Sequence, residues 1–150
     1  MNKKRILAIV MTVVMALAFL TGCGGKKTSV KDDLTNYDKE ASKIMQEMKK
    51  TDTKDIDKFQ AAMKDGIKKF EDIDIKTDDV KDLNKLAIKG FEGLVDAISE
   101  ALKAQKNNDM KLQTKATEKY EKATKVLGDF EKKYEALGKK EGVTLKLTVN

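Results

Sequence analysis

The chain has 150 residues, with 31 Lys and Arg against 25 Asp and Glu, one Cys, and no Pro, Trp or His. This length suits a single domain. The absence of His removes the commonest general base and the commonest metal ligand. A single Cys excludes an internal disulfide and a Cys-rich zinc site. We therefore expect neither a cofactor nor a metal ion.

The N-terminal residues have the pattern of an export signal. A short cationic stretch, residues 2–5, precedes residues 6–20, which are apolar except for Thr12. As a helix this apolar segment would span ~22 Å, which is less than the ~30 Å hydrocarbon core of a bilayer. The segment is therefore too short for a good permanent membrane helix and suits a transient one.

The apolar segment ends in Leu20-Thr21-Gly22-Cys23, an aliphatic residue and two small residues followed by Cys. This sequence resembles the lipobox of bacterial lipoprotein precursors. The resemblance implies that the signal is cut between Gly22 and Cys23, and that Cys23 becomes the mature N-terminus. It also implies that the Cys23 thiol, a soft nucleophile, takes a diacylglycerol thioether carrying acyl chains such as palmitate.

The lipobox divides the chain into a signal peptide (1–22), a lipidated Cys with a flexible tether (23–29) and a mature domain (30–150). Two acyl chains suffice for stable anchoring, so we expect the mature protein on the extracytoplasmic face of the cell membrane. Removal of residues 1–22 takes away Lys3, Lys4 and Arg5, which lowers the net charge from +6 to +3. With no Arg left, a nucleic-acid partner is not expected.

The mature domain is predicted to be all-α. Apolar residues recur at spacings of three and four over about 30–48, 56–70, 78–106 and 110–137. Short connections between long helices favour antiparallel neighbours. We therefore predict an antiparallel up-down-up-down four-helix bundle. The fourth helix is expected to end at Gly138 as its C-cap.

A short C-terminal extended segment is predicted to follow the bundle. Residues 143–149 alternate apolar and polar side chains, which is typical of a strand. Because one strand cannot satisfy its own hydrogen bonds, this segment can lie along the bundle, pair with a second copy, or join the sheet edge of a partner.

The third predicted helix carries two adjacent apolar stripes, so we expect it to be the most buried. Its interior contains Gly90 and Gly93, and each costs about 1 kcal/mol relative to Ala in a helix. Two structural roles could offset that cost. The glycines allow a close approach of a neighbouring helix, or they line a groove for a ligand.

No pattern of catalytic or metal-binding residues stands out. The acids of residues 72–79 lack the spacing of an EF-hand loop, and the serines have no His to activate them. The lysine-rich mature chain resembles small lipoproteins of Gram-positive bacteria in composition. We therefore predict a non-enzymatic lipoprotein that binds a protein or an envelope component, such as an acidic polymer, close to the membrane.

Two other functions stay open. The first is a small-ligand or lipid-binding module with a pocket between helices near Gly90 and Gly93. The second is an enzyme that uses Asp, Glu, Lys or Tyr alone, which would require clustered carboxylates in a cleft.

Overall fold

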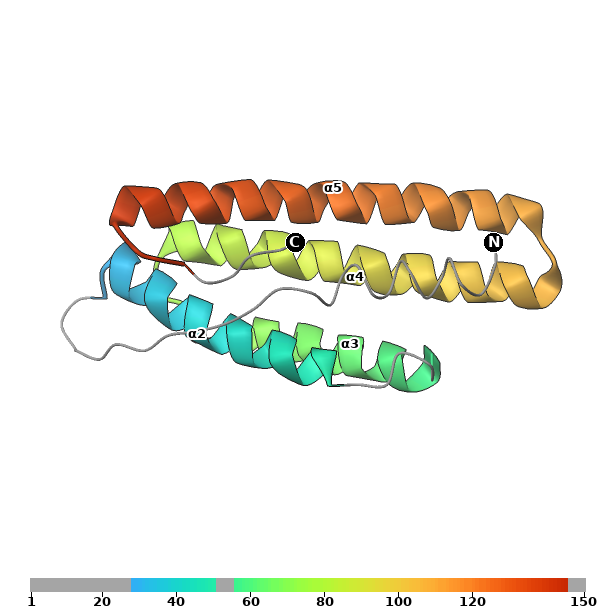
Figure 1. Ribbon diagram of the computed structural model, residues 1–150, viewed down its shortest axis with the longest axis horizontal. Coiled ribbons are helices and arrows are strands. Elements are labelled where there is room, and N and C mark those ends of the chain that lie inside the picture. Colours follow the sequence, from blue (N-terminus) through green and yellow to red (C-terminus); the bar gives the residue numbers. More distant parts are fainter. Residues whose placement is uncertain (1–27, 51–55, 146–150) are drawn as a thin grey trace.

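The computed structural model describes residues 28–50 and 56–145, and this part of the chain is a bundle of four α-helices (Figure 1). The helices are α2 (Val30–Lys49), α3 (Ile56–Glu71), α4 (Asp78–Asn107) and α5 (Met110–Glu141). Each lies where the three-and-four spacing of apolar residues predicts a helix. The prediction of an all-α four-helix bundle is confirmed.

Several predicted features fall outside the described residues. They are the signal peptide (1–22), Cys23, the first part of the tether and residues 146–149 of the predicted extended segment. The last two residues of the tether are described, and Ser29 is the N-cap of α2. Its Oγ accepts a hydrogen bond from the backbone N–H of Asp32 at 3.1 Å, which satisfies one donor at the start of the helix.

A tight turn joins α4 to α5. Asn108 follows α4 in the left-handed conformation, with φ 53°, and the N–H of Asp109 donates to the carbonyl of Ala104 at 2.9 Å. This bond satisfies a free carbonyl at the end of α4. The side chain of Asp109 also caps the start of α5, so this turn both ends one helix and begins the next.

The helices differ in length, and this sets the shape of the molecule. α4 and α5 form a long antiparallel hairpin, and the shorter pair α2 and α3 packs along one part of it (Figure 1). The turn between α4 and α5 projects beyond the start of α3 (Figure 1). The bundle therefore has a four-helix part and a two-helix extension.

The core lies where the four helices meet. Helix α4 contributes the largest number of buried residues, eleven of its 30, but α2 has the larger buried share, nine of its 20. The prediction that α4 is the most buried helix therefore holds for number and not for share. The Phe91 ring of α4 packs on Phe70 of α3 with the ring centres 5.3 Å apart. Tyr134 of α5 stacks on Phe130 at 5.5 Å and meets the edge of Tyr37 of α2 at 6.4 Å. These aromatic contacts join α3 to α4 and α2 to α5, and buried side chains from all four helices form one hydrophobic cluster.

The C-terminal end of α5 differs from the prediction. Gly138 is inside the helix, and the C-cap is Gly142, with φ 63°. The N–H of Val143 donates to the carbonyl of Gly138 at 2.9 Å, as in a Schellman motif. A Cβ atom added at Gly138 would lie 2.3 Å from Cδ1 of Leu145, so Leu145 packs directly against this glycine. The helix therefore continues one turn past Gly138, because Gly142 is the residue that turns the chain.

The described part of the predicted extended segment, residues 143–145, contains no strand. Val143 and Leu145 are half-buried and pack against the core of the same chain. These three residues therefore follow the first of the three alternatives, which is packing on the bundle itself.

Candidate functional site

The predicted lipid-attachment and cleavage residues, Cys23 and Gly22, lie outside the described residues. The structure does place the point to which they are connected. Five residues separate Cys23 from Ser29, the N-cap of α2. The tether therefore enters the bundle at the end where α4 begins and α5 finishes (Figure 1). We call this end the base of the bundle.

The other two predicted site residues, Gly90 and Gly93, face α5. A Cβ atom added at Gly90 would lie 2.4 Å from Cδ2 of Leu127, and one at Gly93 would lie 2.9 Å from Cβ of Ala123. Real Cβ atoms do not come this close to a neighbour. Side chains of α5 therefore occupy the space next to both glycines, which favours close helix approach over a ligand groove.

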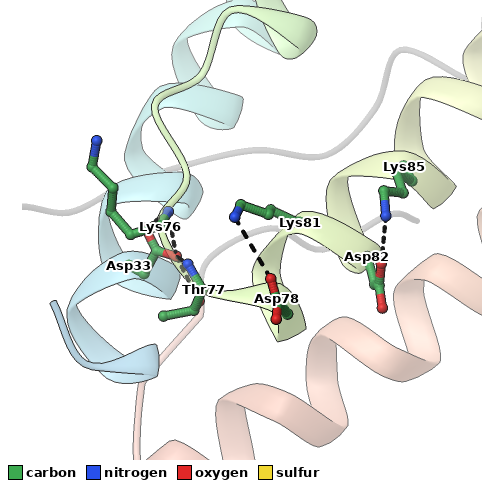
Figure 2. A network of polar contacts seen from close by, with 7 residues as sticks. All are labelled: Asp33, Lys76, Thr77, Asp78, Lys81, Asp82 and Lys85. Atoms are coloured by element: carbon green, nitrogen blue, oxygen red, sulfur yellow. Dashed lines mark hydrogen bonds and ion pairs between the residues drawn. The ribbon is translucent and has the colours of Figure 1, made fainter.

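The base of the bundle is held by a buried carboxylate that the sequence pattern does not single out. Asp33 of α2 is only 2% exposed. Its oxygens accept hydrogen bonds from the backbone N–H groups of Lys76 and Thr77 and from the Thr77 hydroxyl, at 3.1, 2.8 and 2.6 Å (Figure 2). Thr77 is the N-cap of α4, but its own side chain caps nothing. Asp33 therefore supplies, from another helix, a cap for the start of α4.

A second buried polar side chain, that of Asn84, binds the other end of the connection between α3 and α4. Asn84 of α4 is 6% exposed, and its Nδ2 donates to the backbone carbonyl of Phe70 at 2.8 Å. Phe70 lies in the last turn of α3, where carbonyls lack partners within the helix. Asp33 and Asn84 thus fix the two ends of the α3–α4 connection to the bundle.

Two acids in the first turns of α4 pair with lysines of the same helix. Asp78 and Asp82 lie 3.6 and 2.8 Å from the Nζ atoms of Lys81 and Lys85, which are on the same helix (Figure 2). In residues 28–50 and 56–145, no three His, Cys, Asp or Glu side chains gather closely enough to hold a metal ion. The side chains of Asp78, Lys81, Asp82 and Lys85 therefore form exposed ion pairs on the surface at the start of α4.

A buried tyrosine pair crosses the core between α2 and α5. The Tyr134 hydroxyl donates to Oδ1 of Asp38, which is 3% exposed. Burial and this bond to a carboxylate raise the pKa of Tyr134 well above its usual range. Burial alone raises the pKa of Tyr37, whose hydroxyl has no hydrogen-bond partner among the described residues. Both phenols therefore stay protonated and are unsuited to act as bases at neutral pH.

A surface hollow lies between the start of α4 and the end of α5. Its volume is about 340 Å³, and Leu83 and Leu137 contribute its apolar lining. Charges of both signs surround these leucines, from Asp79, Asp82, Lys133 and Lys140. Gly90 and Gly93 are not part of this lining. The hollow is therefore distinct from the groove considered from the sequence.

Asp33, Asp38 and Asn84 were missed because a polar residue in a helix is usually exposed. A signal for them exists in the sequence nevertheless. Each lies three or four residues from apolar residues that flank it on a stripe, as Asn84 does between Val80 and Ala87. A polar residue on an apolar stripe needs a partner inside the protein, so these positions predict cross-helix hydrogen bonds.

Of the helices in the described part of the chain, none combines the length and apolar character needed to cross a bilayer. No protein-family model, curated protein or solved structure matches the chain.

Proposed function

We propose that the chain is the precursor of a lipid-anchored, extracytoplasmic protein whose helical bundle binds a protein or an envelope component close to the membrane, without catalysing a reaction. The observation that carries the proposal is the lipobox, Leu20-Thr21-Gly22-Cys23, placed directly after an apolar segment. Lipidation would make Cys23 the first residue of the mature protein.

The distance between Cys23 and the bundle supports a position near the bilayer. Six peptide steps lead from Cys23 to Ser29, the N-cap of α2, and a fully extended chain of this length reaches at most ~20 Å. The base of the bundle would therefore stay within that distance of the anchored lipid. A component bound by the bundle would also be close to the membrane.

The proposal that the bundle binds rather than catalyses rests on how its residues are used. The chain has no His, and its one Cys is assigned to lipid attachment. The buried carboxylate of Asp33 accepts bonds from the backbone, and that of Asp38 accepts from Tyr134. The contacts of Gly90 and Gly93 with α5 give no support to a small-ligand pocket at these glycines.

The lipid anchor is tested in a bacterium that processes lipoproteins, with the full-length chain and an alkyne analogue of palmitate. We expect label on the wild-type protein, and an N-terminal peptide whose mass corresponds to diacylglycerol-modified Cys23. Cys23→Ala should carry no label, whereas Gly25→Ala, which lies outside the lipobox, should be labelled as fully as the wild type. An unmodified Cys23 thiol, or an intact leader on the wild-type protein, would disprove the anchor.

The binding role is tested by crosslinking in intact cells. We expect the wild-type lipoprotein to crosslink to a membrane-proximal protein or to an envelope polymer, and Cys23→Ala to lose that product. Recovery of no such product from correctly lipidated protein would count against a binding role while leaving the anchor intact.

A further inference from the structure

The tip of the α4–α5 hairpin, which we define as residues 101–117, is positively charged. Four exposed lysines lie in this range: Lys103, Lys106, Lys111 and Lys115. Its one acid is Asp109, whose Oδ1 accepts from the backbone N–H groups of Lys111 and Leu112 at 2.9 and 3.0 Å. Within the described residues, none of the four lysines has an ion-pair partner. The tip therefore presents a net charge of +3 to solvent.

An exposed apolar side chain lies at the end of this charged region. Met110, the first residue of α5, is 74% exposed and is the one large hydrophobic side chain exposed in the described part of the chain. A methionine side chain is unbranched and flexible. Lysines around an apolar side chain suit a bilayer interface, because anionic headgroups attract the lysines and the apolar group enters the boundary of the acyl region.

The base of the bundle has the opposite charge. Residues 71–82 carry six acids and two lysines, so their net charge is −4. The neighbouring parts of the base, residues 28–36 and 133–145, together carry four lysines and four acids and add no net charge. An anionic surface would therefore repel the base of the bundle and attract the tip, at separations within about a Debye length of ~8 Å.

We propose that the tip of the α4–α5 hairpin is a second membrane contact, which binds anionic lipid headgroups and tilts the bundle toward the bilayer. This inference rests on the proposed lipid anchor at Cys23. It adds an orientation to that proposal. The tip touches the lipid surface, so the flanks of the bundle, rather than its far end, are presented to a binding partner.

The lengths of the tether and the hairpin make this contact geometrically accessible. α4 has 30 residues, which corresponds to a length of ~45 Å. The tether allows the base to stand at most ~20 Å from the anchored lipid, so the hairpin can tilt until its tip reaches the headgroups. Because the anchor holds both in one assembly, the tip meets the surface at high effective concentration. This favours a lipid surface over an acidic protein that must first diffuse to the tip.

The test uses the mature lipoprotein with its native lipid, reconstituted in vesicles of phosphatidylcholine with or without phosphatidylglycerol. Thr114→Cys introduces a labelling site at the tip, and Ala136→Cys introduces one at the base; both positions are exposed. The only native Cys, Cys23, is occupied by the lipid anchor, so an environment-sensitive dye reports one position at a time.

We expect the dye at position 114 to be quenched by lipid-borne quenchers in vesicles that contain phosphatidylglycerol. Quenching should be lost in pure phosphatidylcholine and at high salt, and the dye at position 136 should remain in water throughout. Each lysine near an anionic surface contributes about fivefold to binding, so Lys106→Glu with Lys111→Glu should weaken the tip contact by at least about 30-fold. Met110→Ala should weaken it less.

The matched control is Lys64→Glu with Lys68→Glu, which makes the same charge change at exposed positions of α3; it should leave quenching at position 114 unchanged. A lipidated protein that floats with the vesicles, but whose position 114 stays in water with phosphatidylglycerol present, overturns the tip contact and leaves the anchor standing. In that case the tip is free for an acidic protein. A purified protein without lipid on Cys23 overturns the anchor, and the tip contact with it.

Discussion

The base and the tip of the bundle are built from different interactions. At the base, buried polar side chains join elements that are distant in sequence, as Asp33 does with Thr77 and Tyr134 with Asp38. At the tip, the buried side chains of α4 and α5 are small, namely those of Ala104 and Ala116, and the charged groups face solvent. One end of the molecule therefore provides stability, while the other leaves its charges available for contacts.

The largest expected effect is at Asp33. Replacing it with Ala leaves the partly buried N–H groups of Lys76 and Thr77 without their acceptor, and an unsatisfied donor costs about 1–3 kcal/mol when it is buried. We expect Asp33→Ala to lower the free energy of unfolding of residues 24–150 by about 3 kcal/mol, measured by urea denaturation. Asp74→Ala, an exposed change in the same connection, should cost less than about 0.5 kcal/mol. If both changes lowered the free energy of unfolding equally, the hydrogen bonds of Asp33 to the start of α4 would not stabilise the base.

Tyr134 and Tyr37 offer a comparison within the base itself. Tyr134→Phe removes the donor to the buried carboxylate of Asp38, and we expect it to lower the free energy of unfolding by about 2 kcal/mol. Tyr37→Phe removes a buried hydroxyl that has no hydrogen-bond partner among the described residues. That change should be neutral or slightly stabilising at pH 7. Urea denaturation gives the free energy of unfolding of both variants. A larger loss for Tyr37→Phe than for Tyr134→Phe would contradict the prediction.

Above about pH 10, the stability of the fold depends in part on the protonation of the two buried tyrosines. Their pKa values are raised in the folded protein, so the stability linked to their protonation is present below about pH 10 and is lost as the pH rises above it. Each tyrosine makes the free energy of unfolding fall by about 1.4 kcal/mol per pH unit there. Tyr37→Phe should therefore be about 1 kcal/mol more stable than the wild type at pH 11, by urea denaturation. An unchanged pH dependence would show that Tyr37 ionises in the folded state.

Two glycines test the close contact between α4 and α5. Gly93→Ala places a methyl group 2.9 Å from Cβ of Ala123, and the methyl of Ala123 cannot rotate away. We expect a loss of about 1 kcal/mol after the gain in helix propensity is counted. Gly128→Ala meets no atom within 4 Å and should stabilise α5 by about 0.5–1 kcal/mol. The melting temperature should fall for Gly93→Ala and rise for Gly128→Ala. A higher melting temperature for Gly93→Ala would mean that an open groove lies beside this glycine.

The helices and the core were predictable because apolar periodicity reports which face of a helix is buried. The end of α5 was not, because two glycines, Gly138 and Gly142, both suit a helix end. The choice between them depends on a tertiary contact. Leu145 packs on Gly138, and this requires the chain to reverse at Gly142.

The polar groups of the base were harder to predict than its apolar ones. In the sequence, Asp33 is one of two adjacent acids in the first turn of a helix, where the helix dipole favours negative charge, and the neighbouring Asp32 is exposed. What distinguishes Asp33 is its position beside Val30 and Tyr37 on the apolar stripe. Even that position does not identify its partners, because the contact with Thr77 spans 44 residues. The sequence that resembles a lipobox, residues 20–23, is by contrast local, so the resemblance can be seen without a fold.

The smallest expected effect on stability is at the tip, at the lysines that are most important for the proposed membrane contact. Lys106→Glu places an acid in the last turn of α4, where the helix dipole disfavours it, and Lys111→Glu places one in the first turn of α5, where the dipole favours it. Each effect is about 0.3–0.5 kcal/mol, so the double variant should unfold within about 0.5 kcal/mol of the wild type in urea. The two single variants should shift in opposite directions. A double variant that loses several kcal/mol would show that the tip lysines stabilise the fold, and the division between a stabilising base and an available tip would then be wrong.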